Sequence, residues 1–256
     1  MSIHATTDSE TLSRIEAESS SPFTQDTVCA QVVRHLLEKI GDRQLRPGDA
    51  VESEVELSRH LAVSRGSVRE AYRLLAALGV LEIGNGRRPR VNAANSVALA
   101  QIFGHALQIA QATPLHVLEF RRGIEIHSAQ LAARFATEEQ LARLRGLAAD
   151  MRASLGDEAR RSECDMTIHK TLAEASRNPL NSLVLTALQT AISQSLRTDH
   201  SVERSEREIV RIVDAHEAIV ERVCARDPVG AGAAMSCHFD LSVNSLSHGP
   251  QPREWT

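Results

Sequence analysis

From Ser53 to Val91 the chain reads SEVELSRHLAVSRGSVREAYRLLAALGVLEIGNGRRPRV. Ser53 is followed three residues later by Glu56, a capping-box pattern that predicts the start of a short helix. Ser64 is a suitable N-cap for a second helix, and Gly79 would end that helix. The segment therefore predicts two consecutive short helices joined by a tight turn.

The second of these helices has two different faces. Apolar residues recur at helical spacing on one face, at Val68, Ala71, Tyr72, Leu75 and Leu78. The opposite face carries polar and basic residues, namely Arg65, Ser67, Arg69 and Arg73. Serine and arginine side chains bind phosphates and base edges, and a helix of this size fits the major groove of DNA. We interpret this helix as a DNA recognition helix.

A predicted hairpin follows the second helix. Residues 80–83 and 90–91 can pair as short strands, and residues 84–86 (Gly-Asn-Gly) provide the tight turn. Arg87, Arg88 and Arg90 are expected to crowd the tip of this hairpin. Together with the two helices, a positive hairpin indicates a winged helix-turn-helix. The alternative is a charged, solvated face on an ordinary helical domain.

The composition favours a helical protein with a site-specific nucleic-acid contact. Aromatic residues are only 3% of the 256 residues, so the cores must be built from Ala, Leu, Val and Ile. The net charge is -4, yet residues 22–92 hold 11 Lys and Arg against 9 Asp and Glu. A mildly basic domain in an acidic chain fits a protein that reads one DNA site, not one that coats nucleic acid.

The sequence also predicts the compartment. No apolar run approaches the roughly 20 residues of a membrane span, and the N-terminus lacks the apolar core of a signal peptide. The four cysteines show no Cys-x-x-Cys pair. We expect a cytoplasmic protein with reduced thiols and no membrane partner.

The expected domain organisation has five parts. They are a disordered tail (1–21), the winged helix-turn-helix (22–92), a linker that becomes a helix (93–112), an all-helical domain (113–247) and a tail (248–256). The first helix is expected to begin at Thr24. Helix-start signals in the second half stand at residues 113–114, 137–140, 178–179 and 227–228, and no strand signal appears there. The fold class is therefore mainly α, with a bundle of six or seven helices.

Two boundaries in this bundle are predicted from single features. The helix that starts after Thr137 is expected to end at Gly156. The penultimate helix is expected to run from about Val202 to Arg226.

A carboxylate and three histidines can meet inside the bundle. Asp165 and His169 are four residues apart, so they share one face of a helix. His216 lies 11 residues before Asp227 and His238 lies 10 after Pro228, on either side of a helix break. With about 1.5 Å of rise per residue, an antiparallel helix pair brings both histidines to the same level.

One aspartate and three histidines suit a divalent metal ion and leave coordination positions for water or a ligand. Zinc is the first choice, with nickel or manganese as alternatives. Cys164 and Cys237 adjoin two of these residues but would point about 100° away on a helix, so they are not counted as ligands. The four residues could also be separate surface or capping groups.

The first helix of the bundle carries Arg121 and Arg122. Either guanidinium could hold a carboxylate through two hydrogen bonds. A surface pair with Glu125 is an equally good interpretation.

These motifs resemble a known family. The winged-helix domain of GntR transcription regulators is similar at residues 45–49 (LRPGD), 52–54 (ESE), 64–71 (SRGSVREA) and 78–81 (LGVL). The ligand-binding domain of their FadR-like branch, called FCD, is similar at Arg121, Glu125, Ala132-Ala133, Asp165, His169, Asn178-Pro179, His216 and His238. The resemblance covers about residues 24–247.

The resemblance implies a homodimeric transcription regulator, a repressor or an activator, that binds palindromic double-stranded operator DNA; of the two, we expect a repressor. The implied DNA-binding residues lie on the recognition helix and at the wing tip: Ser64, Arg65, Ser67, Arg69, Asn85, Gly86, Arg87 and Arg88. A small organic acid would bind in the FCD domain over a metal held by Asp165, His169, His216 and His238, and Arg121 would meet its carboxylate.

The sequence departs from the family pattern in two places. Val55 stands where the family often has arginine, which puts one DNA contact in doubt. The wing sequence from Gly86 to Arg90 resembles that of the fatty-acid-responsive member, whose ligand domain lacks the metal residues. We therefore interpret the chain as a metal-dependent FCD regulator and not as an acyl-CoA sensor.

Two other functions fit parts of the sequence. In a metal-dependent helical enzyme with a fused winged domain, the same Asp and His residues would activate water. The sequence shows no general base beyond the proposed ligands. A winged helix used for protein contact is disfavoured by the arginines on the recognition helix and hairpin.

Overall fold

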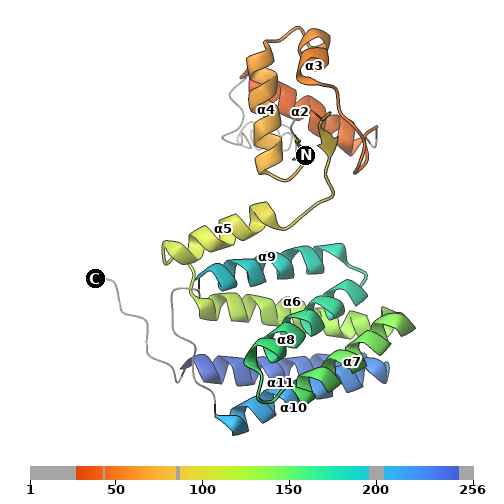
Figure 1. Ribbon diagram of the computed structural model, residues 1–256, viewed down its shortest axis with the longest axis vertical. Coiled ribbons are helices and arrows are strands. Elements are labelled where there is room, and N and C mark those ends of the chain that lie inside the picture. The colour runs from red at the N-terminus through yellow and green to blue at the C-terminus, as the bar shows by residue number, and fades with distance from the viewer. Residues whose placement is uncertain (1–26, 43, 85–86, 196–204, 248–256) are drawn as a thin grey trace, which may run out of the picture. The chain divides into compact units, whose positions relative to one another are not determined.

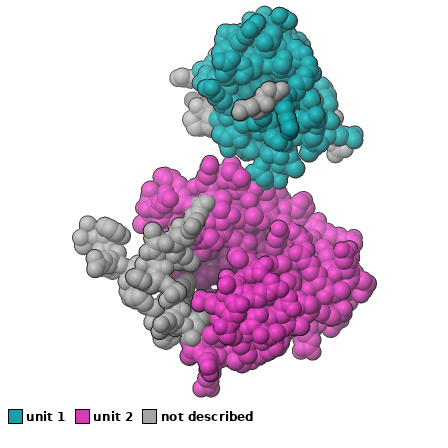
Figure 2. Space-filling view, viewed as in Figure 1, with its two compact units in different colours: residues 1–95 teal, residues 96–256 magenta. Residues whose placement is uncertain are grey.

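The computed structural model describes residues 27–42, 44–84, 87–195 and 205–247 (Figure 1). The tails predicted at 1–21 and 248–256 lie outside these residues, as do Asn85 and Gly86. The chain divides into two compact units, residues 1–95 and 96–256, which Figure 2 colours separately. The described part is mainly helical, with a winged helix-turn-helix before a helical bundle, so the predicted fold class is confirmed.

The first unit contains three helices and a hairpin: α2 (Val28–Gly41), α3 (Glu54–His60), α4 (Arg65–Ala77), β1 (Leu81–Glu82) and β2 (Arg90–Val91). The second unit contains α5 (Val97–Gln108), α6 (Pro114–Phe135), α7 (Glu138–Ala153), α8 (Glu158–Ala175), α9 (Pro179–Ser195), α10 (Glu206–Cys224) and α11 (Pro228–Ser247). No helix of the described residues is long and apolar enough to cross a membrane.

Side-chain caps fix the starts of the two helix-turn-helix elements. The Ser53 hydroxyl accepts a hydrogen bond from the Glu56 amide at 3.3 Å, and the Glu56 carboxylate accepts one from the Ser53 amide at 2.8 Å. The predicted capping box is therefore confirmed. Ser64 caps α4 by accepting from the Ser67 amide at 3.1 Å, and Ala62 turns the chain between the helices with a φ of 54°.

The core of the first unit is formed by all its elements. Its buried residues are Val32, Leu36, Val51, Leu57, Val68, Ala71, Tyr72, Leu75, Leu81 and Val91. Leu78 was predicted to extend the apolar stripe of α4, but its side chain is 52% exposed. The reason is that α4 ends at Ala77 and Leu78 is its C-cap, after which Gly79 turns the chain with a φ of 75°.

The hairpin pairs antiparallel, with Leu81 opposite Val91 and Glu82 opposite Arg90. The predicted strand at residues 90–91 is confirmed, and Arg90 therefore lies in β2 and not among the arginines of the hairpin tip. Its guanidinium donates to the Gly48 carbonyl at 2.6 Å, which ties the hairpin to the segment before α3.

Helix α6 is central to the second unit. It packs against α8, α9, α10 and α11, and it lies between α9 and α11 in Figure 1. Thr113 caps this helix ahead of Pro114, and Thr137 with Gln140 forms the capping box of α7, both as predicted. The linker helix α5 packs against α9.

Three predicted boundaries were wrong. Helix α2 begins at Val28 and not at Thr24, because Thr27 is extended and caps it. Helix α7 ends at Ala153, with Ser154 as its C-cap, before Gly156 is reached. Helix α10 begins at Glu206 and not near Val202, because Ser205 and Glu208 form a capping box there.

Gly79→Ala should destabilise the first unit. The left-handed φ of 75° costs an alanine about 1–2 kcal/mol, and an added Cβ would lie 2.7 Å from the Asn95 side chain. Gly41→Ala is the matched control, because nothing lies within 4 Å of a Cβ there. The free energy of unfolding, measured with urea, should fall for Gly79→Ala and stay unchanged or rise slightly for Gly41→Ala. Equal effects would contradict this account of the turn.

Candidate metal centre and DNA-binding helix

Four predicted ligands from three helices meet in the second unit. Asp165 and His169 come from α8, His216 from α10 and His238 from α11, and each offers a ligand atom within 4.8 Å of the others. The ring centroids of His216 and His238 are 4.4 Å apart in an edge-on arrangement, so the helix hairpin brings these two residues to the same level, as its spacing predicted. The His169 ring lies 5.3 Å from His216 and 5.0 Å from His238.

Hydrogen bonding fixes the proton on His216. Its Nδ1 lies 2.8 Å from the carbonyl oxygen of Ile212, one turn earlier on α10. Because a carbonyl oxygen only accepts, Nδ1 must donate, and the lone pair is then on Nε2. That Nε2 faces Oδ1 of Asp165 at 2.7 Å. Two lone-pair atoms at this distance are satisfied only by a proton or a cation between them.

Glu125 orients His169 in the same way. Its carboxylate contacts Nδ1 of His169 and also accepts a hydrogen bond from Nε of Arg121 at 2.7 Å. Since the carboxylate accepts from Nδ1, the lone pair of His169 is on Nε2, which lies 3.8 Å from Oδ1 of Asp165. A carboxylate behind a histidine fixes the tautomer and makes the ring a more basic ligand.

The sequence analysis did not predict this role of Glu125, because it considered only an arginine as the partner of that residue. Glu125 is 1% exposed. A signal was present, because Glu125, Ala129 and Ala132 are spaced four and then three residues apart and therefore share the buried face of α6. A buried acid on such a face needs a partner across the bundle.

Four imidazole nitrogens at this point are buried and make no hydrogen bond of regular geometry within the described residues: Nδ1 and Nε2 of His169, Nε2 of His216 and Nδ1 of His238. Of these, Nδ1 of His169 contacts Glu125 and Nε2 of His216 contacts Asp165 as ion pairs. Buried polar atoms without a partner are rare in folded proteins. Together with the Asp165 carboxylate the three imidazoles form a donor set that suits a borderline divalent ion such as zinc. The residues present therefore fit a metal ion.

The pKa shifts of His238 and Asp165 agree with that fit, whereas Glu125 raises the pKa of His169 against the effect of burial. Burial, together with the neighbouring His216 and His169, lowers the pKa of His238 to about 2, so this ring is neutral near pH 7. Burial alone would raise the pKa of Asp165, but the facing histidines, His216 foremost, hold that pKa below its usual value. A neutral imidazole and an ionised carboxylate are the forms that bind metal.

Arg121 lies beside this cluster and is not a surface residue. Its side chain is 14% exposed, and its guanidinium lies 5.8 Å from the ring centroid of Phe239, which also contacts His169 and His238. The pairing with Glu125 that the sequence allowed is present, but it is buried. Arg122 is directed elsewhere, to Ser236 at 2.7 Å and Asp240 at 2.8 Å.

The predicted recognition helix presents exposed arginines with different environments. Arg65, in the first turn of α4, is exposed and has no polar partner among the described residues. Arg69 pairs with Glu54 of α3, its Nη2 lying 2.9 Å from Oε2. Ser64 and Ser67 are 2.9 Å apart through their hydroxyl oxygens, so each is partly engaged in capping the helix.

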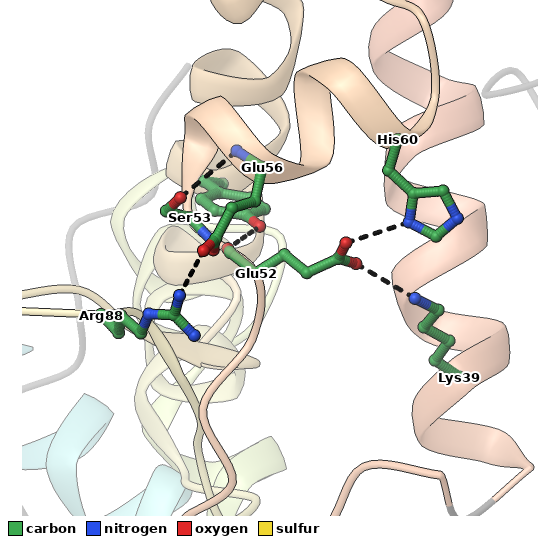
Figure 3. Close-up of polar contacts among 7 residues, drawn as sticks. Lys39, Glu52, Ser53, Glu56, His60 and Arg88 are labelled. Atoms are coloured by element: carbon green, nitrogen blue, oxygen red, sulfur yellow. Dashed lines mark hydrogen bonds and ion pairs between the residues drawn. The ribbon is translucent and has the colours of Figure 1, made fainter.

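The wing arginines differ in the same way. Arg88 pairs with Glu56 of α3, as Figure 3 shows. Arg87 is exposed, and within the described residues its side chain has no polar partner. The structure therefore brings Arg69 and Arg88 to the acidic first turn of α3.

Two family models match the chain. The model for bacterial regulatory proteins of the gntR family matches residues 29–91, and the FCD domain model matches residues 116–241. The chain belongs to the GntR family. It combines the DNA-binding domain of that family with an FCD domain, so it is a DNA-binding transcription regulator.

Curated relatives are similar over most of this GntR regulator. The HTH-type transcriptional regulator LutR of Bacillus subtilis is 28% identical over 210 residues, 81% of this chain and 96% of that protein. The HTH-type transcriptional repressor NanR of Cronobacter sakazakii is 29% identical over 86% of this chain and 85% of its own length. These names are of regulators and not of enzymes, which confirms the prediction that the chain is not an enzyme.

A solved structure supports the fold assignment. The Streptococcus agalactiae GntR structure has a TM-score of 0.64 at 23% identity and covers 85% of this chain and all of its own. At that identity the likeness shows the fold alone.

Glu125→Ala should destabilise the metal-free FCD domain strongly. The substitution leaves Arg121 and His169 without their buried partner, and breaking a buried ion pair costs about 3–5 kcal/mol. Glu174→Ala is the control, since the i,i+4 pair of Lys170 and Glu174 is exposed and 3.9 Å long and is worth at most about 1 kcal/mol. Both values come from urea unfolding with a chelator present. Similar small losses for both variants would show that Glu125 is not holding the cluster together.

Proposed function

We propose that the chain is a transcriptional repressor that binds a palindromic operator as a homodimer and responds to a small organic acid at a divalent-metal site in its FCD domain. The observation that carries this proposal is the convergence of three buried imidazoles and the Asp165 carboxylate beside Arg121, with all four ligand atoms within 4.8 Å of one another. The repressor assignment is supported by the similarity to a protein named as a repressor.

The metal would be held by Asp165, His169, His216 and His238. Zinc is the first choice for this donor set, and nickel or manganese are alternatives. The three histidine side chains are buried, whereas the Asp165 side chain is 35% exposed, so the cluster is open on the side of the carboxylate. A bound divalent ion supplies a Lewis-acid contact for an anionic oxygen.

Arg121 is the residue for the effector carboxylate. Its Nε is used by Glu125, and its two terminal nitrogens have no polar partner in the part of the chain that the structure describes. A guanidinium presents its nitrogens in a fixed plane, which suits two parallel hydrogen bonds to a carboxylate. Glu125 thus links the two halves of the site, since it holds both Arg121 and His169.

The acid would control DNA binding by binding one arrangement of the dimer more tightly than another. Two winged domains read half-sites related by a two-fold axis, so their spacing decides operator affinity. An effector that favours one arrangement shifts the population toward it. A coupling of about 1–3 kcal/mol changes operator affinity by about 5–150-fold. The ligands come from α8, α10 and α11, so occupancy fixes three helices of the FCD domain relative to one another.

His216→Ala should remove one zinc ion per chain. Elemental analysis of zinc-loaded, gel-filtered protein measures this loss. The control is His127→Ala, which replaces an exposed histidine of α6 and should retain the full amount of zinc.

A thermal-shift screen of sugar acids, hydroxy acids and dicarboxylates tests effector binding. An acid that binds should stabilise only the metal-loaded protein. At 100 times its dissociation constant the gain is about 2.7 kcal/mol. If His216→Ala keeps the wild-type zinc content, the proposed metal site is wrong. If an acid stabilises the protein equally well after the metal has been chelated, the metal has no role in effector binding.

Arg65→Ala and Arg69→Ala should each weaken operator binding without unfolding the protein. A lost contact to a phosphate or base costs about 1–3 kcal/mol, or roughly tenfold to a hundredfold in affinity. Arg134→Ala, which removes an exposed arginine from the end of α6, is the charge-matched control. Gel shifts measure the affinity and circular dichroism checks the helix content. Wild-type affinity in both variants would overturn the recognition-helix assignment.

A further inference from the structure

A second group of metal-binding side chains lies in the DNA-binding unit. His35 comes from α2, Glu52 from the segment before α3 and His60 from the last position of α3, and each offers a ligand atom within 4.8 Å of the others. Nδ1 of His60 is 3.0 Å from Oε1 of Glu52, and the two side chains point toward one another in Figure 3. The ring centroids of His35 and His60 are 5.8 Å apart.

One ligand atom of this group lacks a partner. Nε2 of His35 is buried and accepts or donates no hydrogen bond among the described residues. A buried imidazole nitrogen without a partner, on a ring grouped with a carboxylate and a second imidazole, is the pattern of a zinc ligand.

The backbone around Glu52 is held in place by other contacts. The Tyr72 hydroxyl donates to the Glu52 carbonyl at 2.5 Å, and the capping box starts at the next residue, Ser53. The Glu52 side chain reaches toward Lys39 of α2 and toward His60, while Ser53, Glu56 and Arg88 form a separate cluster (Figure 3). The carboxylate is therefore positioned by the fold and not by its partners alone.

The distances are compatible with a shared ion. Two ligands bound tetrahedrally at about 2.0–2.1 Å from zinc lie about 3.3 Å apart. The contact between Glu52 and His60 is close to that value, and the ligand atom of His35 lies within 4.8 Å of both. The ammonium of Lys39 lies 3.1 Å from Oε2 of Glu52 and leaves Oε1 for the ion.

We infer that His35, Glu52 and His60 form a second site for a zinc-like divalent cation, with an open coordination position for water. The ion links α2 to the end of α3. His60 is followed by the turn at Ala62 that leads into the recognition helix. Occupancy therefore stiffens the helix-turn-helix itself. This site lies in the other unit from the effector site and does not depend on it.

A cation-free charge network of Lys39, Glu52 and His60 is the competing explanation. The variant Lys39→Gln distinguishes the charge network from the inferred cation site. It removes the ammonium from Glu52 and so breaks the network, but it keeps all three ligands and lowers the competing positive charge. The inferred site retains its zinc in this variant.

The experiment uses the full chain, stripped with chelator, reloaded with zinc and gel-filtered before elemental analysis. Wild type should hold about two ions per chain, His60→Ala and His216→Ala about one each, and the double variant none. Lys39→Gln and His127→Ala should keep both ions. The His60 side chain is 53% exposed, so the alanine variant is expected to fold, and circular dichroism verifies this.

Two results would overturn the inferred site. In one, His216→Ala retains no zinc. In the other, the double variant with His60→Ala and His216→Ala holds as much zinc as His216→Ala alone. The effector-domain site fails separately: in that case wild type and His216→Ala hold one ion each and His60→Ala holds none.

Discussion

A buried imidazole nitrogen with a lone pair needs a proton donor or a cation, and the FCD domain of this protein gathers three at one point. Contacts at the other ring nitrogen orient two of these imidazoles. The Ile212 carbonyl accepts the proton on Nδ1 of His216, and the Glu125 carboxylate contacts Nδ1 of His169. Helices α6, α8, α10 and α11 therefore have to pack in a way that satisfies this cluster as well as the apolar core around it. The packing of the bundle and the polar contacts at its centre therefore depend on each other.

The DNA-binding unit solves a different electrostatic problem. Its arginines must stay available for phosphate, yet like charges on α4 and the wing repel one another. The acids Glu54 and Glu56 of α3 relieve this repulsion by pairing with Arg69 and Arg88. These pairs are exposed and therefore weak. A DNA phosphate can replace each carboxylate at small cost, whereas Arg65 needs no such exchange.

Four helix starts could be predicted closely because they are decided by neighbours in sequence, whereas α2 and α10 begin later than predicted. Ser53, Ser64, Thr113 and Thr137 cap the helices where the pattern placed them. The pairing of His216 with His238 was also predictable, since two helices and a short break fix the level of each. Contacts between distant segments were not predictable. Arg90 bonds to Gly48 across 42 residues, and the role of Glu125 toward His169 depends on how α6 packs on α8.

The two candidate cation sites differ in ways that set their order of filling. The FCD site has four protein ligands, of which three are buried histidines, and no ammonium contacts its carboxylate in the described residues. The site on α2 and α3 has three ligands, and Lys39 lies against its carboxylate. Each protein ligand adds affinity and a neighbouring positive charge subtracts from it. On the proposals made above, we therefore expect the FCD site to fill first as the metal concentration rises. The proposed site on α2 and α3 would fill only at a higher concentration, so a metal signal to the DNA-binding unit would be separate from the organic acid.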